Sequence, residues 1–146
     1  MDYHIQTDNS LHYFREFREM IEASLRKEGF IGLVGGTSYS KADVLSKIET
    51  YRILIQDTAR IILCAKNSVE WVCIFCAAVL DQKELFILDA HIDRQKLCNL
   101  AASVRADLVI TDDEADFREP AFCPIGQLPF RSPAGEAVTG TGKIIL

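Results

Sequence analysis

Two short apolar runs flank a longer one between residues 60 and 89, and no other feature of the sequence constrains the fold as strongly. Residues 61–64 and 85–88 are of strand length, whereas residues 71–80 form an unbroken apolar or small-residue run that is too long for one strand. The longer run is also too short to cross a bilayer, which takes about 20 apolar residues. It therefore predicts a buried helix between two strands. Such a βαβ unit has parallel strands, and strands that are apolar throughout indicate the centre of an open α/β sheet.

The chain before this central unit predicts a helix followed by a hairpin. Asn9 or Ser10 can cap an amphipathic helix that ends near Gly29, since its apolar residues recur at steps of three and four. Its other faces carry charges of both signs, which is typical of a solvated face rather than of a membrane-bound helix. Residues 30–34 and 37–39 then flank a Gly-Gly pair, which indicates a two-residue hairpin turn because both turn positions need a positive φ.

Polar residues mark the starts of the next two helices. Ser40, with Asp43 three residues later, predicts a capping box for the helix that precedes the central unit. Asn67, with Glu70 three residues later, predicts the cap of the central helix, and Ser68 is the alternative cap. Both signals support the strand–helix boundaries inferred from the apolar runs.

The chain after the central unit predicts a further helix and strand before it becomes irregular. Asp93 predicts a helix cap, and residues 107–111 (DLVIT) predict a third parallel strand. Right-handed crossovers then place the helices on both faces of the sheet. Prolines and glycines punctuate residues 120–136, which predicts an irregular and at most weakly stranded stretch.

Together these segments predict a single α/β subdomain over residues 1–146, with an open, mainly parallel sheet and helices on both faces in three layers. Within it we expect a loose N-terminus at 1–9, a core at 10–113, an irregular loop-rich stretch at 114–142 and the start of a strand at 143–146. Because a core strand is an unusual place for a natural chain to stop, we expect this chain to be a truncated piece of a longer protein.

Composition excludes several classes of function. The chain is 49% apolar and 25% charged, as globular proteins are. Its net charge of −5 argues against a nucleic-acid surface, which needs a basic face. The polar N-terminus does not resemble a signal peptide, and the five cysteines are an odd number. We therefore expect a cytoplasmic protein with reduced thiols and no membrane span.

Two motifs suggest chemistry but have simpler interpretations. Cys73 and Cys76 form a C-x-x-C, yet they lie inside the predicted helix rather than at its N-terminus, so buried apolar thiols are the better interpretation. The GTGK sequence at residues 140–143 lacks the rest of a Walker motif, because Ala137 and Ile144 stand where Gly and Ser or Thr are required. It predicts a plain turn.

The remaining candidates are acidic. Asp89 and the pair Asp112–Asp113 follow two predicted parallel strands, at the edge where open α/β sheets bind ligands. They are candidates for a metal or phosphoryl role, although polar residues also commonly end strands. For the three histidines, His4, His12 and His91, the sequence spacing reveals no Ser, Cys or Asp partner that would indicate a catalytic arrangement. The residues alone therefore assign no catalytic residue and no metal ligand, and the cofactor-binding residues stay unknown.

Four segments occur in an order that matches a known family. Residues 37–48 (TSYSKADVLSKI) read as a strand-to-helix opening, and residues 59–80 contain a strand followed by an Asn-Ser-x-Glu-Trp helix start. Residues 85–113 give an aliphatic strand ending in Asp, a helix and a strand reading ADLVITDD, and residues 143–146 read KIIL. In this order they resemble the adenylate-forming superfamily, which includes acyl-CoA synthetases, peptide-synthetase adenylation domains and beetle luciferase.

The resemblance is good over about residues 31–113 and the last four residues. Its most specific piece is the Asn-Ser-x-Glu-Trp sequence at residues 67–71. The chain departs from the family at residues 81–84, where Asp-Gln-Lys-Glu replaces a small-residue turn, and at Ile87, where Pro is common. These departures indicate a divergent member.

The resemblance implies the Rossmann- or flavodoxin-like half of an adenylating-enzyme large domain. The implied parent is an AMP-forming carboxylate ligase of the acyl-CoA synthetase kind, which makes an acyl-adenylate and then a thioester. The family's phosphate loop, adenine and magnesium motif, ribose-binding Asp and C-terminal lysine would all lie beyond Leu146, so none carries over and this chain alone is expected to be inactive. ATP and Mg²⁺ are expected for the parent, with no cofactor in this chain.

The resemblance also implies partners: the missing C-terminal part of the enzyme, a small carboxylate, and CoA or a carrier protein, but no nucleic acid. Two other hypotheses stay open on the sequence. One is a non-catalytic α/β binding or regulatory module. The other is a flavodoxin-like nucleotide or phosphate binder that uses Asp89 and Asp112.

Overall fold

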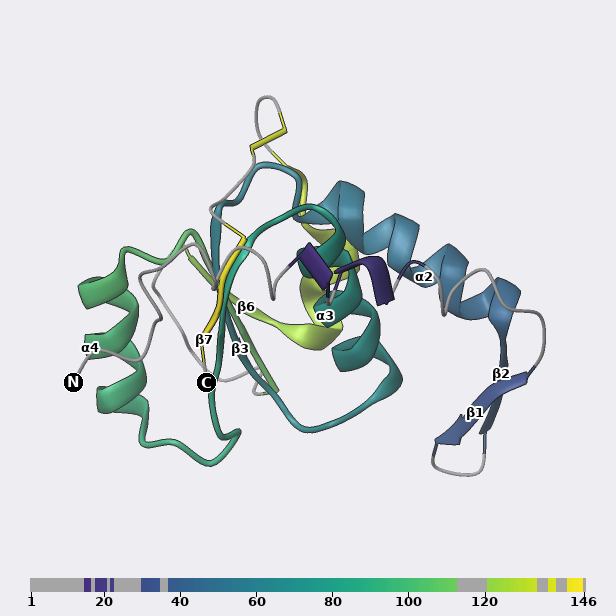
Figure 1. Ribbon diagram of the computed structural model, residues 1–146. Coiled ribbons are helices and arrows are strands. Elements are labelled where there is room, and N and C mark those ends of the chain that lie inside the picture. The colour runs from purple at the N-terminus through teal and green to yellow at the C-terminus, as the bar shows by residue number, and fades with distance from the viewer. Residues whose placement is uncertain are drawn as a thin grey trace.

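The computed structural model describes residues 15, 16, 18–20, 22, 30–34, 37–112, 121–133, 137, 138 and 142–145. The described residues form a two-stranded hairpin and a five-stranded sheet with helices on both faces (Figure 1). The sheet occupies the middle of the molecule, and the hairpin projects to one side of it (Figure 1).

The five-stranded sheet is parallel throughout, with the strand order β6-β5-β3-β4-β7. Its strands are β3 (Arg60–Cys64), β4 (Glu84–Ile87), β5 (Leu108–Thr111), β6 (Phe122–Pro124) and β7 (Ile144–Ile145). At the centre, Ile62 of β3 lies opposite Phe86 of β4 on one side and Val109 of β5 on the other. The predicted parallel βαβ unit and third parallel strand are confirmed.

Helices cover both faces of this sheet. α2 (Lys41–Leu54), α3 (Val69–Leu80) and the 3-10 helix η1 (Ile125–Phe130) lie on one face, and α4 (Arg94–Val104) lies on the other (Figure 1). α4 begins after its predicted cap, Asp93, whose carboxylate accepts a hydrogen bond of 3.2 Å from a backbone N–H of the first turn. The three-layer α/β architecture is confirmed. Among the described helices, none has the length and apolarity needed to cross a membrane.

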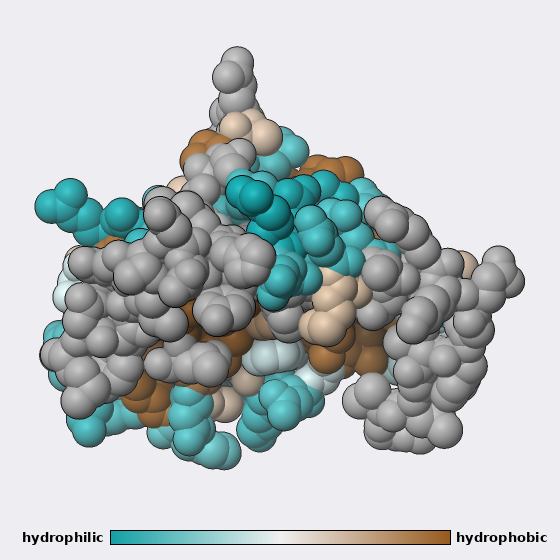
Figure 2. Space-filling view, viewed as in Figure 1, coloured by the Kyte–Doolittle hydropathy of each residue, from teal (hydrophilic) through white to brown (hydrophobic). Residues whose placement is uncertain are grey.

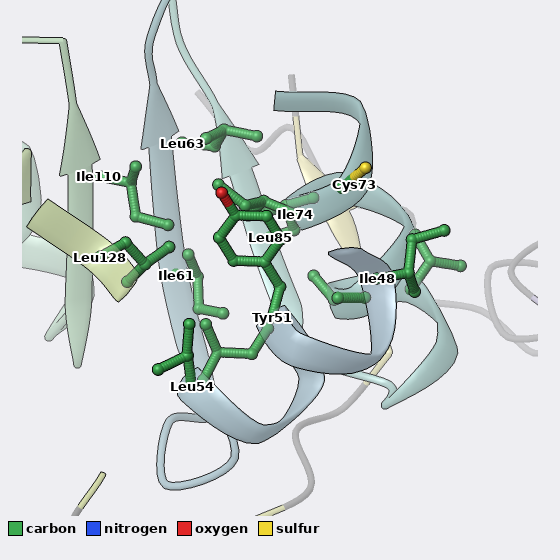
Figure 3. Close-up of a cluster of buried hydrophobic side chains, with 14 of the residues drawn as sticks. Ile48, Tyr51, Leu54, Ile61, Leu63, Cys73, Ile74, Leu85, Ile110 and Leu128 are labelled. Atoms are coloured by element: carbon green, nitrogen blue, oxygen red, sulfur yellow. The ribbon is translucent and has the colours of Figure 1, made fainter. Parts of the chain in front are cut away.

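The alternation of side chains along each strand divides the core in two. Ile61 and Leu63 of β3 belong to a large cluster with α2, α3 and η1, whereas Ile62 and Cys64 belong to a smaller cluster with α4. Successive residues of a strand point to opposite faces, so the unbroken apolar run of β3 supplies both clusters. Figure 3 shows the large cluster, with Tyr51 of α2 packed between the sheet and α3.

Helix caps explain where α2 and α3 begin. Ser40 Oγ accepts from the Asp43 backbone N–H at 3.1 Å, and Asp43 Oδ2 accepts from the Ser40 N–H at 3.2 Å, which confirms the predicted capping box. For α3, Ser68 Oγ accepts from the Trp71 N–H at 3.0 Å. The first interpretation, with Asn67 as the cap, is therefore wrong and the alternative is confirmed. With Asn67 as the cap, Ser68 would be the first helical residue. Instead Ser68 has an extended backbone and α3 begins at Val69.

The hairpin is antiparallel, as predicted, and pairs β1 (Phe30–Val34) with β2 (Thr37–Ser40). Its turn at residues 35–36 lies outside the described residues, as do both predicted ends of the first helix. The described residues between 15 and 22 are helical.

Within the stretch predicted to be irregular, the described residues contain the short strand β6 and the helix η1. Leu128 of η1 is fully buried in the large core cluster. Arg131 follows η1 and makes a bidentate ion pair with Asp57, with atom distances of 2.6 and 3.0 Å. Its Nη1 also donates to the carbonyl oxygen of Leu54 at 2.6 Å. These contacts fasten the irregular stretch to the end of α2.

Candidate functional site

The carboxyl edge of the parallel sheet brings the predicted acidic candidates near one another. β3 lies between β4 and β5, so the loop after Cys64 runs between Asp89 and Asp112. Asp112 Oδ2 accepts from the Lys66 backbone N–H at 2.9 Å, and Asp89 Oδ1 accepts from the His91 backbone N–H at 2.8 Å. Both carboxylates therefore hold loop backbone.

The central thiol at this edge is held in its protonated form. Cys64 Sγ donates to the carbonyl oxygen of Asp89 at 3.2 Å. Burial, together with the nearby charges of Asp112 and Asp89, raises the pKa of Cys64 to about 11. A thiol with this pKa is almost entirely protonated near pH 7 and is a poor nucleophile.

The residues at this edge do not fit a metal or nucleotide site by themselves. Asp113 lies outside the described residues, and His91 is exposed. Over the described ranges, no group of three or more His, Cys, Asp or Glu side chains could hold a metal ion. Among the described residues, this edge therefore offers no set of metal ligands.

The C-x-x-C motif lies inside α3. Cys73 is completely buried and Cys76 is half-buried. Burial raises the pKa of each thiol to about 11. Both cysteines are free and serve as small apolar residues of the helix, as the sequence indicated.

The Asn-Ser-x-Glu-Trp sequence forms the head of α3 and has structural contacts. After the Ser68 cap, Glu70 Oε1 accepts from Lys47 Nζ at 2.9 Å and so joins α3 to α2. Burial opposes ionisation of Glu70, but the hydrogen bond and charge of Lys47, together with a backbone hydrogen bond, outweigh it and lower the pKa of the carboxyl. The Trp71 ring stacks on Phe75 with centroids 5.5 Å apart. This motif therefore fixes how α3 meets α2.

A second candidate site lies at the opposite, amino edge of the sheet, where α2 and α3 end. It is a hollow of about 510 Å³, and Figure 2 shows hydrophilic side chains gathered over this end of α2. Lys83, at its base, is only 2% exposed. Its ammonium group donates to the carbonyl oxygen of Gln56 at 3.2 Å and to that of Val138.

The sequence carries no signal for this site. Lys83 belongs to the Asp-Gln-Lys-Glu turn at residues 81–84, and the carbonyl groups that accept from it come from residues 27 and 55 positions away. The described part of the GTGK sequence lies close by, since the Gly142 N–H donates to the carbonyl of Gln82 at 3.1 Å before the chain enters β7. No local pattern signals such a cluster.

The fold described above, a parallel sheet in the order β6-β5-β3-β4-β7 with α2 and α3 on one face and α4 on the other, matches part of the N-terminal subdomain of adenylation domains. O-succinylbenzoate coenzyme A synthetase (MenE) from Bacillus subtilis, solved with AMP, shares it with a TM-score of 0.62 and 11% identity, over 80% of this chain and 33% of that one. The NpsA N-terminal subdomain from Klebsiella oxytoca matches with a TM-score of 0.61 and 10% identity, over 85% of this chain and 34% of that one.

A third match, NpsA-ThdA, is an artificially fused adenylation–PCP di-domain from Klebsiella oxytoca, with a TM-score of 0.62, 10% identity and coverage of 85% of this chain and 26% of that one. No protein-family model and no curated protein sequence matches this chain. At such low identity the likeness shows a shared fold. The chain spans about a third of the length of the first two matched chains, at 33% and 34%. The resemblance seen in the sequence is therefore confirmed at the level of the fold.

Proposed function

We propose that this chain is the N-terminal part of an AMP-forming carboxylate ligase of the acyl-CoA synthetase kind, and that it is catalytically incomplete by itself. The observation that carries the proposal is the coverage of the structural matches, which is 80% and 85% of this chain but 33% and 34% of the matched chains. The ordered sequence segments at residues 37–48, 59–80 and 85–113 support it independently. In this proposal residues 1–146 form one α/β subdomain of a cytoplasmic enzyme.

The position of β7 supports the same proposal. β7 pairs in parallel with β4, with Leu85 opposite Ile144, so a segment that follows β7 would leave the sheet at the edge that holds Asp89. In the family that the chain resembles, the corresponding strand runs into the phosphate loop. The carboxyl edge of this sheet would then form the platform on which that loop is mounted.

The parent enzyme would need ATP, which would supply the adenylyl group and release pyrophosphate, and Mg²⁺, which would neutralise the phosphate charge. Asp89 and Asp112 each accept a hydrogen bond from loop backbone, so the role we assign to them is to hold these loops. The contribution we assign to this chain is therefore to position loops, without binding ATP or Mg²⁺ itself. It orders the loops after β3, β4 and β5 around one edge of a rigid sheet.

Two experiments test the proposal. The coding DNA should continue in frame past Leu146 into Thr/Ser/Gly-rich sequence. The product of that longer frame should catalyse carboxylate-dependent exchange of pyrophosphate into ATP, whereas residues 1–146 alone should not. A stop codon directly after Leu146 in the natural gene would contradict the proposal and favour a non-catalytic α/β module.

Light scattering distinguishes these two functions by association. A subdomain removed from its partner half exposes apolar surface and sheet edges, so residues 1–146 should self-associate as concentration rises. A stable monomer across the concentration series would favour the stand-alone binding or regulatory module instead.

A further inference from the structure

The hollow between the ends of α2 and α3 has a buried cation at its base. Lys83 Nζ donates to two backbone carbonyl groups, so one of its three N–H groups remains without a hydrogen bond among the described residues. Both partners are neutral. A buried ammonium group without a carboxylate partner is costly, and an anion in the hollow would relieve that cost.

A second cation at the same hollow also has hydrogen-bonding capacity to spare. Arg18 Nε is buried and makes no hydrogen bond within the described part of the chain, although it lies 3.3 Å from Glu22 Oε1. Arg18 and Lys83 both line the hollow, yet they come from the N-terminal helix and from the turn before β4. Two segments that are distant in sequence thus each contribute a positively charged side chain to the lining of the hollow.

The two acidic side chains of the hollow, Glu49 and Asp81, share one guanidinium, that of Arg52. Arg52 donates to Asp81 Oδ1 from two nitrogens at 3.0 and 2.7 Å, and to Glu49 Oε1 at 3.1 Å. These carboxylates therefore repel an incoming anion less than free ones would. Arg52 commits three of its five N–H groups to these contacts, and Lys83 and Arg18 supply the other two cations of the lining.

The walls are partly apolar. Ile53 is 60% exposed and Val138 is 41% exposed, and Leu80 lines the hollow beside them. The volume of about 510 Å³ lies within the range of sites for small organic molecules and exceeds the needs of a single inorganic anion. The apolar walls fit the body of such a molecule.

From this geometry we propose that the hollow binds a small organic molecule carrying one oxyanion group, a carboxylate or a phosphate, with Lys83 and Arg18 as its positive partners. The burial that lowers the pKa of Lys83 agrees with this, since a bound anion would raise it again. The site lies at the opposite edge of the sheet from the platform assigned above and does not depend on the proposed function.

The test is a titration of the isotope-labelled 146-residue chain by NMR, with butyrate, methyl phosphate and inorganic phosphate as probes and sodium chloride at equal ionic strength as control. Saturable shifts of the Gln82, Lys83 and Val138 amide signals are expected for butyrate or methyl phosphate, with a Kd of about 1 mM or tighter. Saturation by only one of these two would identify the oxyanion. No saturable shift at these amides up to about 10 mM would overturn the proposal.

Variants test the assigned partners. K83M keeps an unbranched side chain without its charge and should weaken binding by about tenfold or more, and R18Q should weaken it by about threefold or more. K96M, on the far face of the sheet, is the matched control and should leave binding unchanged. If K83M does not fold, R18Q decides alone, because Arg18 is partly exposed. Unchanged binding by R18Q would overturn the proposal.

Discussion

Removing the Arg131 guanidinium while keeping its apolar stem, in R131M, should destabilise the chain by about 2 kcal/mol. The side chains of Arg131 and Asp57 are 21% and 12% exposed, so their pair lies between an exposed ion pair, at about 0.2–1 kcal/mol, and the loss of one partner from a fully buried pair, at about 3–5 kcal/mol. The change also removes a donor from the Leu54 carbonyl. For a chain of this length, 2 kcal/mol corresponds to a fall in Tm of about 4–8 °C.

Urea unfolding followed by the fluorescence of Trp71, the single tryptophan, measures this loss. Asp57 has a further interaction partner, so the cleanest quantity is the coupling energy from a cycle of R131M, D57N and the double variant. We expect a coupling of about 1–2 kcal/mol. K96A, on the exposed side of α4, is the control and should change the free energy of unfolding by less than about 0.5 kcal/mol. A coupling near zero would show that the stretch after η1 is not fastened to α2.

Three further predictions concern the central unit. S68A should cost about 1 kcal/mol in urea unfolding and N67A much less, because Ser68 is the cap; equal costs would contradict this. L63A should cost about 2–5 kcal/mol by the same measurement, because the side chain is fully buried, and a loss below 1 kcal/mol would place β3 at the surface. Folding raises the pKa of Cys73 and Cys76 from 9.0 to about 11, so the folded state holds these two protons more tightly than the unfolded state. The free energy of unfolding should therefore keep their full contribution below about pH 9 and lose it between pH 9 and 11. A free energy of unfolding that stays constant over that interval would be contrary evidence.

The centre of the fold could be predicted from sequence because its signals are local. The apolar run of α3 is longer than those of β3 and β4, and short polar breaks separate the three, so their structures and the parallel pairing of the strands follow from a few residues each. The cap of α3 could not be decided in this way. Asn67 and Ser68 are both good caps, and the choice depends on where the first helical turn closes.

The rest of the fold depends on contacts between distant residues. β6 has three residues and no alternating pattern, and it is a strand because its backbone pairs with β5. η1 is fastened by Leu128 and Arg131, whose partners lie far away in sequence. From the sequence Lys83 is an ordinary turn residue, but in the fold its ammonium group donates to the carbonyl groups of Gln56, just after α2, and Val138. The candidate hollow was therefore invisible to sequence patterns.

The most direct test of the account is the direction of the central strands, measured from backbone NOEs in the isotope-labelled chain. The structure predicts that residues 61, 62 and 63 lie opposite residues 85, 86 and 87, with both series rising together, and that residues 61, 62 and 63 also lie opposite residues 108, 109 and 110 in the same sense. NOEs in which one series rises while the other falls would mean antiparallel hairpins, and would contradict both the fold and the proposed function built on it.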